Sequence, residues 1–309
     1  MNDIGVEIWR GGVQPWECDQ MGHMNVAFYL AKATEALGGL AARLGLPGVF
    51  RPGTETTLIL RDQHIRYLRE ARLGAPLHMT GGVVQMGESD GRFLMLLHHA
   101  DGALAATYQL VAEHVDARTG EARPWPVEAR ARAQNLMVEI PSTAAARSCS
   151  LEPVTPQAIS RARALDLGLP QTTLGVVQLG ECDVFGRMRP DAFLSRLLDG
   201  AVHLGRRGPE DKKTFDPKSG IGGAAVEYRL VYFGWPSVGD RIEVRAGWAS
   251  VGPKVRNLVY WALDAETGEP WCMADSVTVS FDLNTRKIIT LEGDDLERVR
   301  AQVIPGLAL

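Results

Sequence analysis

The sequence predicts an α+β protein built from two copies of one unit, in which a single helix packs against a long antiparallel sheet. An internal repeat is the first observation: residues 13–37 align without gaps on residues 177–201, and eight of the 25 pairs are identical. The agreement continues downstream, where residues 66–79 match residues 231–244. A length of 309 residues suits two modest domains.

The first copy shows a helical pattern followed by strand patterns. Apolar side chains recur at the i, i+3, i+4, i+7 spacing over residues 25–44, which predicts a helix with one buried stripe. Gly45 and Pro47 mark its end. Strands punctuated by turn residues are expected at residues 58–68, 77–86, 92–99 and 105–115.

The second copy repeats this order. A helix is expected over about residues 190–205, because Pro190 suits the first turn of a helix. The strands that follow are expected near residues 224–233, 241–251, 254–263 and 273–283.

These patterns divide the chain into two domains and a linker. We expect an N-terminal domain over residues 1–140, a linker over residues 141–170 and a C-terminal domain over residues 171–309. Residues 126–139 and 294–303 are predicted to form additional helices.

Composition narrows the class of function. Apolar residues make up 45% and charged residues 23%, as in ordinary globular proteins. The net charge of −4 gives no general attraction to nucleic acid or anionic lipid, so a small ligand is expected. Neither a signal peptide nor a long apolar run is visible, which predicts a cytoplasmic protein without a membrane span. Cysteine spacing indicates neither a metal ribbon nor a disulfide framework.

Chemically active side chains are concentrated just before the first helix. Residues 17–25 contain Asp19, His23 and Asn25. The first turn of a helix offers unpaired N–H groups that suit a carbonyl oxygen becoming anionic. Asp19 could activate water or attack directly, while His23 and Asn25 orient the acyl group. Alternatively, Asp19 caps a turn and Asn25 is the helix N-cap.

The run Asp19-Gln-Met-Gly-His-Met-Asn, with Tyr29 and Glu35 on the helix, resembles the D-x-x-G-H-V-N-N…Y…E pattern of hotdog-fold thioesterases. That superfamily includes the 4-hydroxybenzoyl-CoA type and the plant-type acyl-ACP thioesterases. The segment from His64 to Gly74 is also similar to the strand pair that follows the family's helix. The resemblance implies two tandem hotdog domains, each a long antiparallel sheet wrapped around a central helix. They would form a pseudo-dimer within the chain, which could assemble into a homo-oligomer.

The resemblance also implies the catalytic roles. Asp19 would be the catalytic carboxylate, as nucleophile or general base, with His23 and Asn25 as its catalytic partners. Val26 stands where the family has a second Asn, so a hydrogen bond from that side chain is not available. No cofactor is implied, because coenzyme A enters as part of the substrate.

Further positions would bind the substrate. The resemblance implies that backbone N–H groups from Gly22 to Met24 polarise the thioester carbonyl, and that Tyr29 and Glu35 lie at the substrate. No metal site is expected: His98 and His99, for instance, are adjacent in a strand and face opposite sides.

The second copy departs from this pattern. It keeps Asp183 but has Arg187 and Arg189 in place of the histidine and the asparagine. Two arginines would suit an anion, such as a CoA or pantetheine phosphate or a substrate carboxylate. Alternatively, this half has lost its site and serves as a scaffold. We expect one working site per chain, in the first copy. The basic run at residues 206–213 could also meet a nucleotide phosphate, although short charged runs are usually solvated.

The leading hypothesis is hydrolysis of an acyl-CoA thioester, with acyl-ACP as the less favoured carrier. A thiolate leaves readily, so a carboxylate and an oxyanion site could suffice. Acyl-CoA hydration or dehydration is a second hypothesis, although the Asp-x-Asn-Pro…His arrangement of that branch is absent. A non-catalytic acyl-thioester-binding protein is a third. The strand at residues 105–116 is similar to thioesterase domains associated with carnitine and betaine breakdown, which suggests a small polar acyl group.

Overall fold

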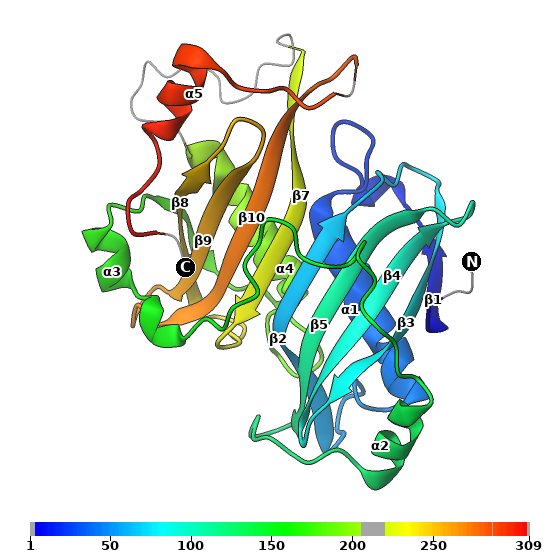
Figure 1. Cartoon of the computed structure of the whole chain (residues 1–309). Helices are drawn as coiled ribbons and strands as arrows, with labels where there is room; N and C mark the ends of the chain where they lie inside the picture. Colours follow the sequence, from blue (N-terminus) through cyan, green and yellow to red (C-terminus); the bar gives the residue numbers. More distant parts are fainter. Residues whose placement is uncertain (1–3, 205–219, 286, 308–309) are drawn as a thin grey trace. The chain divides into compact units, whose positions relative to one another are not determined.

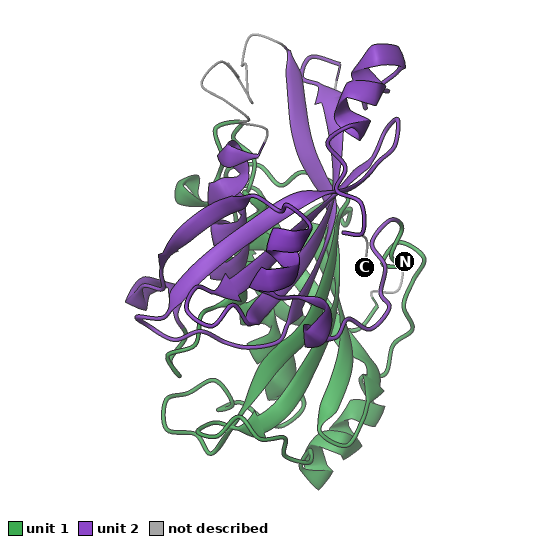
Figure 2. Cartoon of the chain, turned by 90° about the vertical axis from the view of Figure 1, so that its left-hand side faces the viewer, with its two compact units in different colours: residues 1–147, 183–191 green, residues 148–182, 192–309 purple. Residues whose placement is uncertain are grey.

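The chain forms two compact units in the computed structural model, which describes residues 4–204, 220–285 and 287–307. The first unit comprises residues 1–147 and 183–191, and the second comprises residues 148–182 and 192–309 (Figure 2). The boundary after Arg147 falls within the predicted linker. Each unit contains one central helix and one antiparallel sheet, which confirms the predicted fold class.

In the first unit, five antiparallel strands follow the order β1-β3-β4-β5-β2, and the sheet lies over one side of α1 (Figure 1). The elements of this unit are β1 (Val6–Gly12), α1 (Val26–Arg43), β2 (Thr56–Tyr67), β3 (Pro76–Met86), β4 (Asp90–His99), β5 (Leu104–Asp116) and α2 (Val127–Gln134).

Helix α1 is held at its start and along one face. Asn25 is its N-cap, and the side-chain oxygen of Asn25 accepts a hydrogen bond from the N–H of Ala27 at 3.0 Å. Gly39 allows α1 to approach β1 closely, because a Cβ atom at this position would collide with the carbonyl of Ile8. Leu30, Ala33, Leu37 and Leu40 of the predicted apolar stripe are buried.

The segment after α2 packs on the sheet of the first unit. The N–H of Val83 donates to the carbonyl of Leu136 at 2.8 Å, and the N–H of Val138 donates back to Val83 at 2.9 Å. Arg66 then binds the chain where the predicted linker begins. Its guanidinium donates to three backbone carbonyls, those of Ser142, Thr143 and Ala145.

The second unit repeats the plan with the strand order β7-β10-β9-β8-β6. Its central helix ends at Asp199 and continues as a 3-10 turn to His203, shorter than the predicted helix, whose last residue lies outside the described residues. The elements are α3 (Arg161–Asp166), β6 (Gln171–Val176), α4 (Pro190–Asp199), β7 (Ile221–Tyr232), β8 (Arg241–Val251), β9 (Arg256–Asp264), β10 (Pro270–Asp282) and α5 (Gly293–Arg300).

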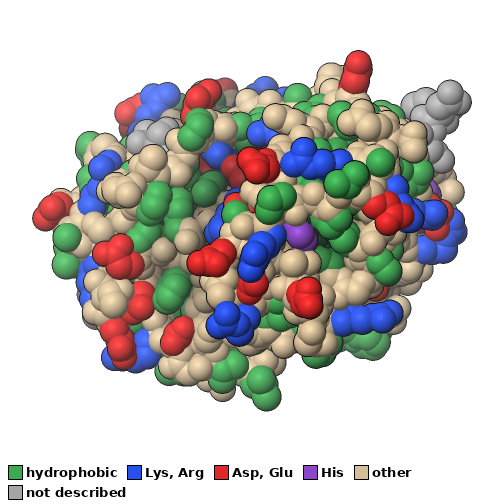
Figure 3. Space-filling model, turned by 90° about the horizontal axis from the view of Figure 1, so that it is seen from below, with side chains coloured by type: hydrophobic (Ala, Val, Ile, Leu, Met, Phe, Trp, Pro, Cys, Tyr) green, Lys and Arg blue, Asp and Glu red, His purple; other side chains and the backbone are tan. Residues whose placement is uncertain are grey.

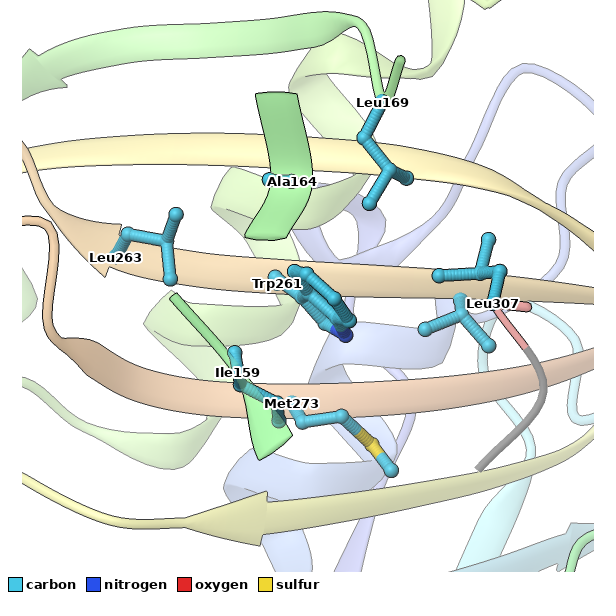
Figure 4. Close-up of a cluster of buried hydrophobic side chains, with 8 residues drawn as sticks. Ile159, Ala164, Leu169, Trp261, Leu263, Met273 and Leu307 are labelled. Atoms are coloured by element: carbon cyan, nitrogen blue, oxygen red, sulfur yellow. The ribbon is translucent and has the colours of Figure 1, made fainter. Parts of the chain in front are cut away.

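Trp261 of β9 lies at the centre of a hydrophobic cluster in the second unit (Figure 4). Ile159 and Ala164, from the segment that precedes β6, pack against it together with Met273 of β10 and Leu307 near the end of the chain. Each of these side chains is at most 2% exposed. The later part of the predicted linker therefore contributes to the core of the second unit.

The surface carries both signs of charge. Figure 3 shows one face on which basic and acidic side chains are interspersed instead of gathering by sign. None of the described helices is long and apolar enough to cross a membrane.

Candidate active site

The predicted catalytic residues lie on the motif loop, which we define as residues 18–25, between a 3-10 turn (Pro15–Glu17) and α1. Asp19 shapes this loop with one carboxylate oxygen: its Oδ1 accepts hydrogen bonds from the N–H groups of Met21 at 2.8 Å and His23 at 3.2 Å. The N–H of Asp19 donates to the carbonyl of His23 at 2.8 Å. Gly22 has φ +73°, a conformation that favours glycine.

The other carboxylate oxygen of Asp19 is open. The residue is exposed, and Oδ2 has no hydrogen-bond partner within the part of the chain that the structure describes. One oxygen therefore fixes the side chain while the second can reach water or a substrate. This is the geometry that a nucleophile or general base requires.

His23 lies beside a second carboxylate, which the sequence did not predict. His23 Nε2 and Glu70 Oε2 are 3.2 Å apart, and the histidine side chain is 14% exposed. Glu70 reaches this position because the loop between β2 and β3 pairs with the motif loop: the N–H of Met24 donates to the carbonyl of Ala71 at 2.8 Å, and His23 forms a β-bridge with Arg72. The repeat contains one sign of this contact. The second copy lacks both partners, because Arg187 stands at the position of His23 and Trp235 at the position of Glu70.

The backbone N–H groups expected to polarise the substrate carbonyl are engaged within the chain. The N–H of Gly22 donates to the carbonyl of Asp19, and those of His23 and Met24 donate to Asp19 Oδ1 and Ala71. The loop thus uses the N–H groups of Gly22 and Met24 to hold its own turn, and their role at the substrate stays a prediction. The N–H of Val26, at the first position of α1, has no acceptor among the described residues.

The structure shows one of the two alternatives that the sequence left open for Asn25, the helix N-cap, while the catalytic role stays a prediction. Its Oδ1 atom serves as the N-cap of α1. Its Nδ2 amide group has no partner among residues whose positions are described, so it remains a donor next to the N–H of Val26 in the sequence. These two groups are the available candidates for an oxyanion site.

Of the two helix residues expected at the substrate, Tyr29 is buried and Glu35 is exposed. The hydroxyl of Tyr29 accepts a hydrogen bond from the N–H of Ala71 at 3.1 Å, and the residue is only 4% exposed. Burial raises the pKa of Tyr29 to about 12, which keeps the hydroxyl protonated. Tyr29 is therefore an anchor for the loop that carries Glu70. Glu35 is exposed on α1, off its buried stripe.

A pocket of about 350 Å³ lies next to this constellation, and Glu70 is part of its wall. Arg69 is paired with Asp101 at 2.6 Å, whereas the guanidinium of Arg72 is 70% exposed and 3.8 Å from Glu70. The Nε2 atom of His99 is buried without a hydrogen-bond partner among the described residues. The pocket thus presents polar groups of both charge signs, and its wall is completed by Ala75.

The second loop, residues 182–189, has the same backbone geometry but a closed carboxylate. Asp183 Oδ1 accepts from the N–H groups of Phe185 and Arg187, as Asp19 does in the motif loop. The guanidinium of Arg187 also binds Asp183 Oδ2, at 2.9 and 3.1 Å. Arg189 forms a two-fold contact with Asp191 at 3.0 and 3.1 Å. Both arginines predicted to bind an anion thus hold nearby acidic side chains, Arg187 within the second loop and Arg189 in the first turn of α4.

No group of three or more His, Cys, Asp or Glu residues within residues 4–204, 220–285 and 287–307 is arranged to hold a metal ion. The basic run at residues 206–213 lies outside the described residues.

The chain belongs to the thioesterase-like superfamily, whose family model matches residues 13–133 and 177–302. Both halves are matched, in agreement with the internal repeat. The match confirms the predicted superfamily, and a match to both halves agrees with the predicted tandem hotdog domains.

Individual relatives are more distant. A protein of Rhizobium meliloti (strain 1021) named L-carnitine dehydrogenase/betainyl-CoA thioesterase is 30% identical over 115 residues, which is 37% of this chain and 23% of that protein. The chain therefore spans about a quarter of the length of this relative.

Solved structures share the fold. The acyl-ACP thioesterase of Bacteroides thetaiotaomicron VPI-5482 matches with a TM-score of 0.61 at 10% identity, covering 87% of this chain and 96% of that one. The 12:0-ACP thioesterase of Umbellularia californica matches with a TM-score of 0.63 at 10% identity, covering 87% and 92%. A Lactobacillus plantarum protein assigned as an oleoyl thioesterase gives 0.67 at 13% identity, covering 94% and 99%.

Proposed function

We propose that the protein is an acyl-CoA thioesterase with one working site per chain, in the motif loop of the first copy. The observation that carries this proposal is the state of Asp19, whose Oδ1 atom is fixed by two N–H groups while Oδ2 is open. As a nucleophile, the carboxylate forms a mixed anhydride with the acyl group and expels the thiolate of coenzyme A, and water then cleaves the anhydride. As a general base, it takes a proton from the water that attacks the thioester carbonyl, and the thiolate leaves.

The other groups have supporting roles in this proposal. Nδ2 of Asn25 and the N–H of Val26 are the donors available for the developing oxyanion. His23, held beside Glu70, orients the acyl group or the water. Asp183 takes no part in the reaction, because Arg187 occupies its second oxygen.

We further propose a small polar acyl group, and coenzyme A over acyl carrier protein. The support is the weak similarity to the betainyl-CoA thioesterase and the presence of Glu70 in the wall of the pocket, where its carboxylate would face a cationic acyl group. An acyl-ACP thioesterase, a hydratase and a non-catalytic binding protein remain the alternatives, and a substrate panel separates them.

The central experiment compares Asp19→Asn with Asp183→Asn. Free thiol release is followed on a panel of acyl-CoA esters that includes betainyl-CoA, short straight-chain acyl-CoA and an acyl-ACP. We expect Asp19→Asn to lower kcat about 100-fold or more, since a positioned base contributes on the order of 10²–10⁴. Asp183→Asn should keep kcat within about twofold.

Three results would contradict the proposal. Undiminished turnover by Asp19→Asn would remove its central residue, and equal loss in both variants would show that the second loop also works. Binding of every acyl-CoA ester without thiol release would favour the non-catalytic alternative.

A further inference from the structure

A buried ion pair joins α1 to the residue that precedes the motif loop. The ammonium of Lys32 donates to Glu17 Oε1 at 2.7 Å and Oε2 at 2.9 Å, and also to the carbonyl of Gly12 at 3.1 Å. The two side chains are only 7% and 12% exposed. A buried ion pair gains little stability over apolar residues of similar volume, so its presence calls for another explanation.

Glu17 contacts the chain on both sides of the motif loop. Its Oε2 atom accepts a hydrogen bond from the N–H of Gln14 at 2.9 Å, and its backbone carbonyl accepts one from the N–H of Asn25 at 2.8 Å. Asp19 follows only two residues later. The position of Glu17 therefore sets where the loop begins and where it meets α1, and Lys32 sets the position of Glu17.

The second copy contains the same ion pair. Arg196 binds Glu181 at 2.6 and 2.7 Å and donates to the carbonyl of Val176 at 2.9 Å. Each of these positions lies 164 residues after its counterpart, with arginine in place of Lys32. The loop that follows has the same turn, since the N–H of Asp183 donates to the carbonyl of Arg187 at 2.7 Å.

The ion pair thus accompanies the aspartate and the shape of the loop, and not the histidine and the asparagine, which the second loop lacks. We propose that Glu17 and Lys32 are positioning residues that hold the turn of the motif loop in which Asp19 Oδ1 is bound by the N–H groups of Met21 and His23. As far as turnover is concerned, this inference rests on the proposed function. The effect on loop geometry does not depend on it.

The chain supplies its own matched control. The variant Glu17→Gln/Lys32→Met removes the pair without leaving a lone buried charge, and Glu181→Gln/Arg196→Met does the same in the second copy. With an acyl-CoA that the wild type hydrolyses, we expect the first variant to lose about tenfold or more in kcat with KM within about threefold, because small misplacements of a catalytic group are costly. The second should keep kcat within about twofold.

A conservative change supplies the rescue. Lys32→Arg reproduces the pair found in the second copy and should keep kcat within about threefold of the wild type. Loss of activity in Lys32→Arg equal to that of the double variant would contradict the positioning role. So would equal kcat losses in the two double variants, because activity would then follow general stability.

Amide hydrogen exchange tests the geometry without any substrate. The N–H groups of Met21 and His23, which bind Asp19 Oδ1, should exchange faster in Glu17→Gln/Lys32→Met. In the control variant, the N–H groups of Phe185 and Arg187 should respond instead. Unchanged exchange at Met21 and His23 would overturn the inference. If Asp19→Asn stays active, the proposed function fails while this measurement still decides the positioning role.

Discussion

At the scale of single residues, the side chain four positions after each aspartate decides the state of its carboxylate. In the second loop this residue is Arg187, which binds Asp183 Oδ2 at 2.9 Å. In the motif loop it is His23, which turns to Glu70 and leaves Asp19 Oδ2 open. One substitution between otherwise similar loops therefore separates a carboxylate that can react from one that is neutralised.

Glu70 gives a test of the role of His23. Glu70→Ala should lower kcat about tenfold, because the imidazole loses the partner that orients it. Glu70→Gln keeps a hydrogen-bonding group at this position and should lose less. Steady-state kinetics of both variants, with Tm as a measure of folding, check the prediction. Glu121→Ala, at an exposed position, is the control and should match the wild type; a wild-type kcat in Glu70→Ala would refute the role.

At the scale of elements, the hydroxyl of Tyr29 on α1 accepts a hydrogen bond from the loop between β2 and β3. Tyr29→Phe would leave the N–H of the fully buried Ala71 without its acceptor. We expect the free energy of unfolding to fall by about 1–3 kcal/mol, the cost of a buried unsatisfied donor. Urea unfolding measures this change.

Tyr108→Phe is the matched variant, since Tyr108 donates to the backbone carbonyl of Tyr29 at 3.2 Å. This variant leaves a carbonyl of α1 with one donor fewer. The free energy of unfolding should fall less than it does when an N–H is left unpaired. A greater loss of stability in Tyr108→Phe than in Tyr29→Phe would show that Tyr29 does not anchor the loop.

Periodicity predicted the elements well where it was strong. The helix expected at residues 25–44 is α1 (Val26–Arg43), and the strand expected at residues 77–86 is β3 (Pro76–Met86). Helix α3 was not predicted, because its six residues are too short to show a helical period. Glu70 was missed for a different reason. Its proximity to His23 depends on two loops pairing across a gap in sequence, which local patterns do not encode.

At the scale of the whole molecule, each sheet binds its own part of the segment that connects the copies. Arg66 on β2 holds the chain near Ser142, and Arg229 on β7 donates to the carbonyls of Ser150 and Glu152 at 2.8 and 2.7 Å. The composition of this segment predicted a linker, but it did not predict that arginines of β2 and β7 bind its backbone. A buried arginine needs several acceptors, and backbone carbonyls of an otherwise irregular segment supply them.

The same region of the second unit contains Asp275, whose pKa is raised by burial, and also by Glu227, above its ordinary value of 3.8. The folded state therefore holds this proton more tightly than the unfolded chain. Protonation of Asp275 therefore stabilises the folded state below the pKa of the unfolded chain, and this stabilisation is lost as pH rises through the pKa of the folded state. Asp275→Asn does not titrate, so its Tm relative to the wild type should rise between about pH 4 and about pH 8. Thermal unfolding across that range measures the difference.

Asp282, on the same strand, supplies a control of opposite sign. It is half-buried, and hydrogen bonds from the N–H groups of Thr285 and Asn284 lower its pKa. Its stabilising contribution is present above the unfolded pKa and is lost as pH falls. Asp282→Asn should therefore lower Tm, and more so at about pH 8 than at about pH 4. A Tm difference for Asp275→Asn that does not change with pH would mean that the buried carboxylate carries no cost.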